Sequence, residues 1–170
     1  EHAYTLSAGT KAILAKLDTP VQIRFYASQS AEGMPVFLKT YAQQVDDLLS
    51  EFRQNSRGLI QIQKLDPEPD SDAEDSAKLE GVEPQLLSNG ERVYLGLSVS
   101  LLDQKEAISF LSPERERVLE YDISRAIARV MTPEKAVIGV LSALPVMGTG
   151  AMMPMQQRGE PPWVLIEELK

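Results

Sequence analysis

The segment "IQKLDPEPDSDAEDSAKLEGV", Ile62 to Val82, decides the fold that this sequence predicts. It begins inside "LIQIQKL" at 59–65, where apolar and polar residues alternate as in a half-buried strand. An acidic connection leads to a short helix whose Ala73 and Ala77 are placed to face a core. Gly81 can end that helix, since glycine readily adopts the left-handed conformation common after helices. The segment therefore predicts a strand, an acidic turn and a helix.

The acidic connection "DPEPDSDAED", Asp66 to Asp75, holds six carboxylates and no base, in a chain of formal net charge -8. Its alternating carboxylates imitate the start of a calcium-binding EF-hand loop. Counted from Asp66, however, Ser71 stands where that loop needs glycine and Ala77 where it needs glutamate. The registers starting at Glu68 and Asp70 fail in the same way, and two prolines stiffen the segment. We predict no specific metal site.

The favoured interpretation of the acidic stretch is structural. Asp70, Ser71 or Asp72 can cap the helix. Glu74 and Asp75 in its first turn favour the positive end of the helix dipole by about 0.3–1 kcal/mol each. The stretch also stays open as a docking edge for a partner.

Upstream, "VQIRFYA" at 21–27 alternates as a strand should, after a short helix that Ser7 can cap. Pro35 suits the first turn of a long helix. The apolar residues of that helix recur at helical spacing and predict its buried face, namely Phe37, Tyr41, Val45, Leu48 and Phe52.

Downstream, "SNGE" at 88–91 signals a turn before "RVYLGLSVSLL", which predicts one long strand with alternate apolar residues from Val93 to Leu101 on one face. "DQKE" then turns the chain into "AISFL" at 107–111, as in an antiparallel hairpin. Pro113 opens another helix, which Thr132 and Pro133 close. Its apolar face comprises Leu119, Ile123, Ala126, Ile127 and Val130.

The fold class that follows is α/β. We expect residues 1–131 to form a mixed sheet flanked by helices, built from the runs that start at 21, 59, 93 and 106. Residues 132–170 differ: "AVIGVLSA" at 136–143 is typical of a strand buried on both faces. A loop rich in Pro, Gly and Met follows, and Trp163 begins a helix. We expect 132–170 to be the truncated first strand, loop and helix of a following α/β domain.

Composition argues against most chemistry. The chain has no cysteine, and its single histidine, His2, lies at the start of the chain. "GLSVS" at 96–100 lacks the second glycine of a nucleophile elbow, and we expect Ser98 on the polar face of a strand. "GTG" at 148–150 lacks the third glycine of a dinucleotide fingerprint. We predict no catalytic, cofactor-binding or metal-binding residues.

The sequence also limits the classes of partner that the chain can bind. No run of Lys and Arg suits a nucleic acid backbone, so nucleic acid is excluded. The longest apolar run, 136–148, is too short for a membrane span and contains Pro145. Four methionines at 147–155 suit either a partner surface or packing against later residues. Arg115, Glu116, Arg117 and Glu120 predict a solvated helical face with i,i+4 pairing.

Three strings resemble a thioredoxin-like domain: "IRFYAS" at 23–28, the segment Ile62–Val82, and the hairpin after it. Where a thioredoxin carries its Cys-x-x-Cys, this chain has Ala27, Ser28, Gln29 and Ser30. The resemblance thus implies a thioredoxin-like fold without redox chemistry.

Over nearly its whole length the chain also resembles the auxiliary component of a bacterial ABC transport system of the gliding-motility type. The matching strings, in order, are "YTLSAGTKAILAKLDTPVQIRFYAS", "LDPEPDSDAED", "RVYLGLSVS", "FLSPERERVLEYDISRAI", "VIGVLSALPVMG" and "PPWVLIEELK". This resemblance implies a non-enzymatic, periplasmic region, anchored in the inner membrane by segments outside this chain, beside a permease and an ATPase. It does not imply motility for this protein.

The leading hypothesis is accordingly a protein-interaction or ligand-sensing domain of a transporter complex, with no cofactor. The second is a small-molecule or glycan binding module that uses the open side of the sheet or the Met-rich loop. A hydrolase is the third, because only a terminal histidine is present.

Overall fold

The computed structural model describes residues 4–132. The chain divides into two compact units, Glu1–Glu134 and Lys135–Lys170, so the description falls within the first. His2 and the strand, Met-rich loop and helix predicted within 132–170 lie outside the described residues. The elements are α1 (Ala8–Ala15), β1 (Val21–Ala27), α2 (Val36–Gln54), β2 (Ile60–Leu65), α3 (Asp72–Glu80), β3 (Gln85–Leu86), β4 (Arg92–Val93), β5 (Leu95–Leu101), β6 (Gln104–Ile108), the 3-10 helix η1 (Pro113–Val118) and α4 (Leu119–Met131).

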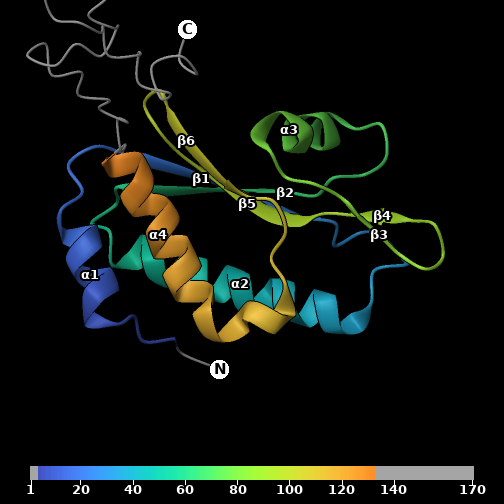
Figure 1. Ribbon diagram of the computed structural model, residues 1–170, viewed down its shortest axis with the longest axis horizontal. Helices are drawn as coiled ribbons and strands as arrows, with labels where there is room; N and C mark the ends of the chain where they lie inside the picture. Colours follow the sequence, from blue (N-terminus) through green and yellow to red (C-terminus); the bar gives the residue numbers. More distant parts are fainter. Residues whose placement is uncertain (1–3, 133–170) are drawn as a thin grey trace, which may run out of the picture. The chain divides into compact units, whose positions relative to one another are not determined.

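A four-stranded mixed sheet in the order β2-β1-β5-β6 forms the centre of the described unit (Figure 1). Strands β1 and β2 are parallel, and β1–β5 and β5–β6 are antiparallel. Phe25 of β1 stands between Lys64 of β2 and Leu97 of β5, which fixes the register. The predicted mixed α/β sheet is confirmed, and β3 and β4 form a separate small ladder.

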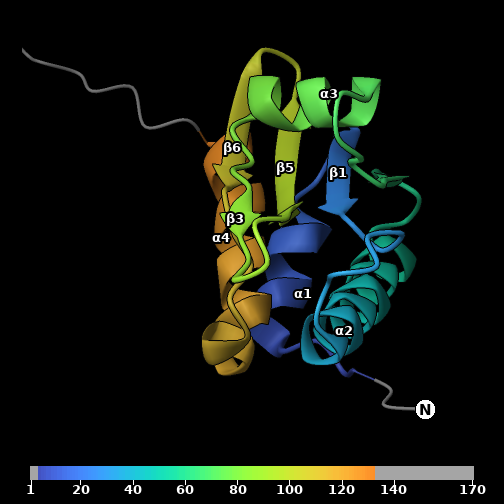
Figure 2. The same ribbon diagram turned by 90° about the vertical axis from the view of Figure 1, so that its right-hand side faces the viewer.

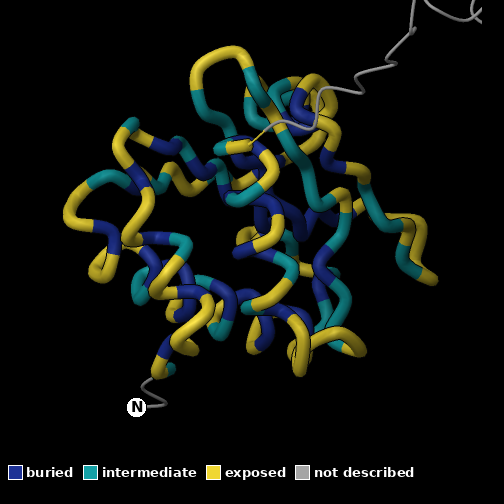
Figure 3. The backbone as a smooth tube through the Cα atoms, turned by 60° about the vertical axis from the view of Figure 1, so that its left-hand side comes forward, coloured by how far each residue is buried: buried dark blue, intermediate teal, exposed yellow. Residues whose placement is uncertain are grey.

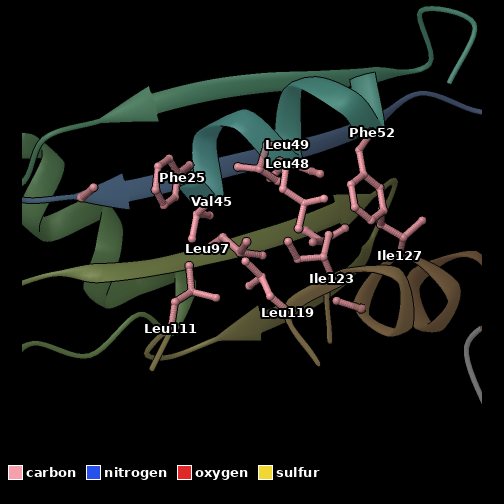
Figure 4. Close-up of a cluster of buried hydrophobic side chains, with 14 of the residues drawn as sticks. Phe25, Val45, Leu48, Leu49, Phe52, Leu97, Leu111, Leu119, Ile123 and Ile127 are labelled. Atoms are coloured by element: carbon pink, nitrogen blue, oxygen red, sulfur yellow. The ribbon is translucent and has the colours of Figure 1, made fainter. Parts of the chain in front are cut away.

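Helices cover the two faces of the sheet unequally. Helices α1, α2 and α4 lie on one face and α3 alone lies on the other (Figures 1 and 2). The main core fills the space on the three-helix side, where Phe25 and Leu97 of the sheet meet Leu48, Phe52 and Ile123 of the helices (Figure 4). Exposed positions gather in the loops and on the outer turns of the helices (Figure 3).

Helix α2 confirms the predicted long helix, but its buried face starts at Leu38, one residue later than the spacing suggests. Pro35 precedes the first helical residue, and Tyr41 and Phe52 are buried as expected. Phe37 is 63% exposed, so its place in the core was wrong. Its neighbour Val36 is 79% exposed, and Leu38 is buried instead. Periodicity identified the helix but not which side chain of its first turn the core covers.

The single long strand predicted from Arg92 to Leu102 is divided at Tyr94 in the structure. Strand β4 ends at Val93 and pairs with β3, whereas β5 starts at Leu95 and pairs with β1 and β6. Strand β5 is also buried on both faces, which places Ser98 at 1% exposure rather than on a solvated face. The predicted β5–β6 hairpin is confirmed, but its turn lies at Leu102 and Asp103 rather than over "DQKE", because Gln104 to Glu106 pair with β5 as part of β6.

Helix α4 buries every residue of its predicted apolar face. It is preceded by η1, whose first residue is Pro113 and whose N-cap is Ser112. The predicted i,i+4 pairing on this segment is wrong for Arg115: its guanidinium donates to both oxygens of Asp122, seven residues later. Within the described residues, no helix is long and apolar enough to cross a membrane.

Helix α3 rests on a much smaller core. Only Tyr26, Ala77, Val82 and Tyr94 form the buried cluster on this side, with Leu65 packed against it. Polar contacts supplement it, because the carboxylate of Glu80 at the end of α3 lies 2.8 Å from Arg24 and 3.0 Å from Lys105. Gly81 ends the helix at φ +87°, as predicted from the sequence.

Candidate functional site

An open cleft lies at the carboxyl ends of the parallel strands β1 and β2. The chain leaves both strands here, and ligands of open α/β sheets often bind just beyond the carboxyl ends of the strands. The cleft encloses about 460 Å³ and receives residues from three connections: the one after β1, the one after β2 and the β3–β4 turn. Its lining comprises Ser30, Ala31, Pro67, Glu68, Pro69, Glu74, Gly90, Glu91, Arg92 and Tyr94.

Ser28 joins the connection after β1 to the connection after β2 and to Tyr94, between β4 and β5, beneath the cleft. It belongs to the Ala27–Ser30 segment, which the thioredoxin resemblance places where redox cysteines would be. Ser28 is fully buried. Its hydroxyl donates to the Pro67 carbonyl at 3.0 Å and accepts from the Tyr94 N–H at 2.9 Å. Its own N–H donates to the Tyr94 carbonyl at 2.9 Å. The hydroxyl therefore holds the fold together and has no proton-accepting partner that would make it a nucleophile.

Part of the acidic connection turns toward the loop after β1. An Asp66 carboxylate oxygen accepts from the Ser30 N–H at 3.0 Å, and a Glu68 oxygen accepts from the Ser30 hydroxyl at 3.1 Å. The chain has no regular secondary structure at 66–68 and then turns at Pro69 and Asp70. Two of the six carboxylates are thus committed to shaping the wall of the cleft.

Ser71 is the residue that caps α3, and Glu74 completes the cap. The Ser71 hydroxyl accepts from the Glu74 N–H at 3.2 Å, which confirms one of the three predicted caps. The Glu74 carboxylate reaches back to accept from the Asp70 N–H at 2.9 Å. This reciprocal arrangement resembles a capping box, shifted by one residue on the carboxylate side.

Glu74 is also the buried anion in the floor of the cleft. It is only 2% exposed, and its second oxygen accepts from the Tyr94 hydroxyl at 3.0 Å. Lys78 lies 3.3 Å and Arg92 3.9 Å from its oxygens. The hydrogen bond from Asp70 is the main cause that holds the pKa of Glu74 below its ordinary value, against the effect of burial. Burial and the bond to Glu74 raise the pKa of Tyr94 to about 12.

The hydrogen bonds and ion pairs of Glu74 limit the chemistry that the cleft can perform. Glu74 stays ionised with both oxygens occupied, so it is poorly suited to accept a proton from a substrate. No group of three or more His, Cys, Asp or Glu among residues 4–132 could hold a metal ion. The side chains at the rim of the cleft are exposed and can contact a bound ligand or partner; they are Ser30, Glu68, Glu91 and Arg92. The arrangement therefore suits recognition by hydrogen bonds and charge.

The structure does not expose the acidic stretch as one continuous edge, and its role as a docking edge for a partner stays a prediction. Asp70, Asp72 and Asp75 are exposed, whereas Glu74 points inward and is buried. The sequence carried a signal for this, because Ser71 followed three residues later by Glu74 is the capping-box pattern. No local sequence pattern predicts the hydrogen bond between Tyr94 and Glu74, because the two residues lie twenty positions apart.

Comparison with known proteins identifies the family. A family model described as a domain of unknown function, DUF7088, matches residues 1–100, which include the cleft and every residue that lines it. No curated protein and no solved structure matches the chain significantly. Because the matched region exceeds half of the 170 residues, the chain belongs to the DUF7088 family.

Proposed function

We propose that this chain is a non-catalytic, extracytoplasmic domain of an auxiliary subunit of a bacterial ABC transporter, where it mediates protein interaction or ligand sensing. The hydrogen bonding in the cleft is the observation that supports the non-catalytic part of this proposal. Its buried polar groups, Ser28, Glu74 and Tyr94, are hydrogen-bonded to one another or to the backbone. What remains on the rim suits binding.

The fold supports the same proposal at a finer level. The order β2-β1-β5-β6, with one parallel pair and an antiparallel hairpin, follows the element order expected of a thioredoxin-like domain. We assign the unit to that class, with the redox position held by Ala27 and Ser30. In this assignment the cleft at the strand ends serves binding rather than redox chemistry.

The transporter assignment rests on the strings that resemble auxiliary components. In this proposal the domain stands on the periplasmic side of the inner membrane, tethered by segments outside this chain. Its partners are the permease and the ATPase of the transporter. Neither a motility role nor a transported substrate is part of the proposal.

Affinity capture of the full-length protein from its own membrane tests the proposed role. After mild detergent extraction, a tagged protein expressed at its natural level should co-purify with a permease and an ATPase in constant ratio. An unrelated membrane protein with the same tag is the control. If both subunits are reproducibly absent while the tagged protein remains folded, the transporter role is wrong.

A small-molecule or glycan binding module is the second candidate, and two observations favour it. The cleft volume of about 460 Å³ falls within the usual range for small-ligand pockets. The strand register also places Gln61, Gln22, Ser100 and Lys105 in one row across the four strands, on the face that carries α3. A thermal shift with a sugar or peptide panel tests this candidate, since a ligand that binds only the folded state raises the Tm.

A further inference from the structure

We infer that the groove between α1 and α4 binds an acidic peptide segment of a partner protein. This groove encloses about 560 Å³. Helices α1 and α4, which form its walls, lie on the face of the sheet opposite α3 (Figures 1 and 2). The α1 wall contributes Ser7 and Thr10, and the η1–α4 wall contributes Arg117, Glu120, Tyr121 and Arg125. The inference does not depend on the transporter role.

The arginines of the η1–α4 segment fall into two classes. Arg115 is held by Asp122 at 2.8 Å, and Arg129 lies 3.6 Å from Glu106. Arg117 and Arg125 line the groove, and no carboxylate among residues 4–132 lies within ion-pair distance of either. The groove lining carries these two guanidinium groups and one carboxylate, that of Glu120, and so has a net charge of +1 in a chain of formal net charge -8.

Glu120 is the one carboxylate in the groove lining, and α1 already satisfies it. One of its oxygens accepts from the Ser7 N–H at 2.8 Å and from the Thr10 hydroxyl at 2.6 Å. Burial raises the pKa of Glu120, but the bonds from Thr10 and Ser7 outweigh that effect and hold the pKa below its ordinary value. Its charge thus faces the positive end of α1, and the two arginines keep their capacity for an outside anion.

Tyr121 lies between the two arginines in sequence, four residues from each, and is 60% exposed. Arg117 lies in the last turn of η1 and Arg125 in α4, so the eight steps between them span about 12 Å or slightly more, at a rise of about 1.5 Å per α-helical and about 2.0 Å per 3-10 residue. An extended peptide rises about 3.3 Å per residue, so two carboxylates about four positions apart would reach both guanidinium groups. An apolar side chain between them would lie over the Tyr121 ring. The groove therefore fits an extended segment of the form acidic, apolar, acidic.

The test uses the full chain and an array of synthetic peptides. Each peptide carries two glutamates at increasing separation with one leucine between them, and a matched peptide carries glutamines. The variants are Arg117→Gln/Arg125→Gln and Tyr121→Ala. Arg53→Gln/Lys39→Gln is the control, because it removes the same charge from exposed positions of α2. Equal Tm values verify that the variants are folded.

Binding that is strongest near the four-position separation supports the inference. It should fall at least tenfold for the glutamine peptide and for the double arginine variant, and stay within twofold for the α2 control. Binding that is equal for the double variant and the control overturns it. So does an absence of glutamate-dependent binding, a preference for phosphatidylserine vesicles over every peptide, or self-association of the chain that the double variant abolishes.

Discussion

Ser28 uses its N–H and its hydroxyl within the fold, where it links the end of β1 to Pro67 and Tyr94. Replacement by alanine would leave the Tyr94 N–H and the Pro67 carbonyl without this partner in a buried site. We predict that Ser28→Ala lowers the free energy of unfolding by about 1–3 kcal/mol. Urea unfolding measures this loss.

The exposed Ser30 offers a matched control for Ser28. Its hydroxyl contacts Glu68 at the rim, so Ser30→Ala should cost no more than about 1 kcal/mol. Equal stabilities of Ser28→Ala and the unmodified protein would contradict the role given to Ser28.

Glu74 should make stability depend on pH in a definite direction. Its folded-state pKa lies below the ordinary value of 4.5, so its stabilising contribution is present above about pH 4.5 and is lost as the pH falls through the folded pKa. We predict that Glu74→Gln lowers the free energy of unfolding at pH 7 by about 1–3 kcal/mol. The difference from the unmodified protein should shrink on acidification.

Unfolding curves recorded from pH 7 down to acid pH check this prediction. Glu83→Gln provides the control, because Glu83 is exposed and its side chain makes no hydrogen bond within residues 4–132. A constant difference between Glu74→Gln and the unmodified protein at every pH would show that the charge of Glu74 is not what stabilises α3.

At the scale of elements, β5 depends on a glycine. A Cβ built on Gly96 would lie 2.6 Å from Val82 and 2.7 Å from the Ile108 carbonyl, so the chain after α3 can cross β5 only over a bare backbone. We predict that Gly96→Ala costs at least about 1–3 kcal/mol, because overpacking forces backbone shifts. Gly9→Ala in α1 has open space and should stabilise by about 0.4–1 kcal/mol. Thermal unfolding of both variants measures the contrast, and equal losses would contradict it.

Helix α3 should be the first element to open. Its buried cluster has only four members, and ion pairs join its Glu74 to Arg92 and its Glu80 to Arg24 and Lys105. We predict that amides of α3 exchange with deuterium faster than those of β1 and α2, and that added salt widens the gap. Hydrogen exchange with mass spectrometry resolves the three segments. Protection of α3 equal to that of β1 would disprove this weak docking.

The elements also mark how far sequence reasoning reaches. The spacing of apolar residues predicts β1, α2 and α4 because each buries one face along its length. It misplaces Phe37 because periodicity does not reveal which side chain of the first turn a neighbour covers. It misses the break at Tyr94 because alternation continues unchanged through a change of pairing partner.

At the scale of the described unit, the cleft was less predictable than the fold. Because the sequence has no cysteine, it predicts that no redox-active cysteine pair follows β1. The spacing of Ser71 and Glu74 predicts the N-terminal cap of α3. The cleft itself arises where three connections meet, and each is separated in the chain by an entire helix or hairpin. Its floor is a buried contact between Glu74 and Tyr94 that depends on tertiary packing.

Site-specific photo-cross-linking in the native membrane tests most directly the central claim that this is a binding domain of a transporter. A photoreactive amino acid replaces Glu91 at the rim of the cleft, and in a second strain it replaces Arg53, exposed near the end of α2. The account predicts a discrete adduct with the transporter permease from position 91 and a much weaker one from position 53. No permease adduct from position 91, or equal adducts from both positions, would contradict the account.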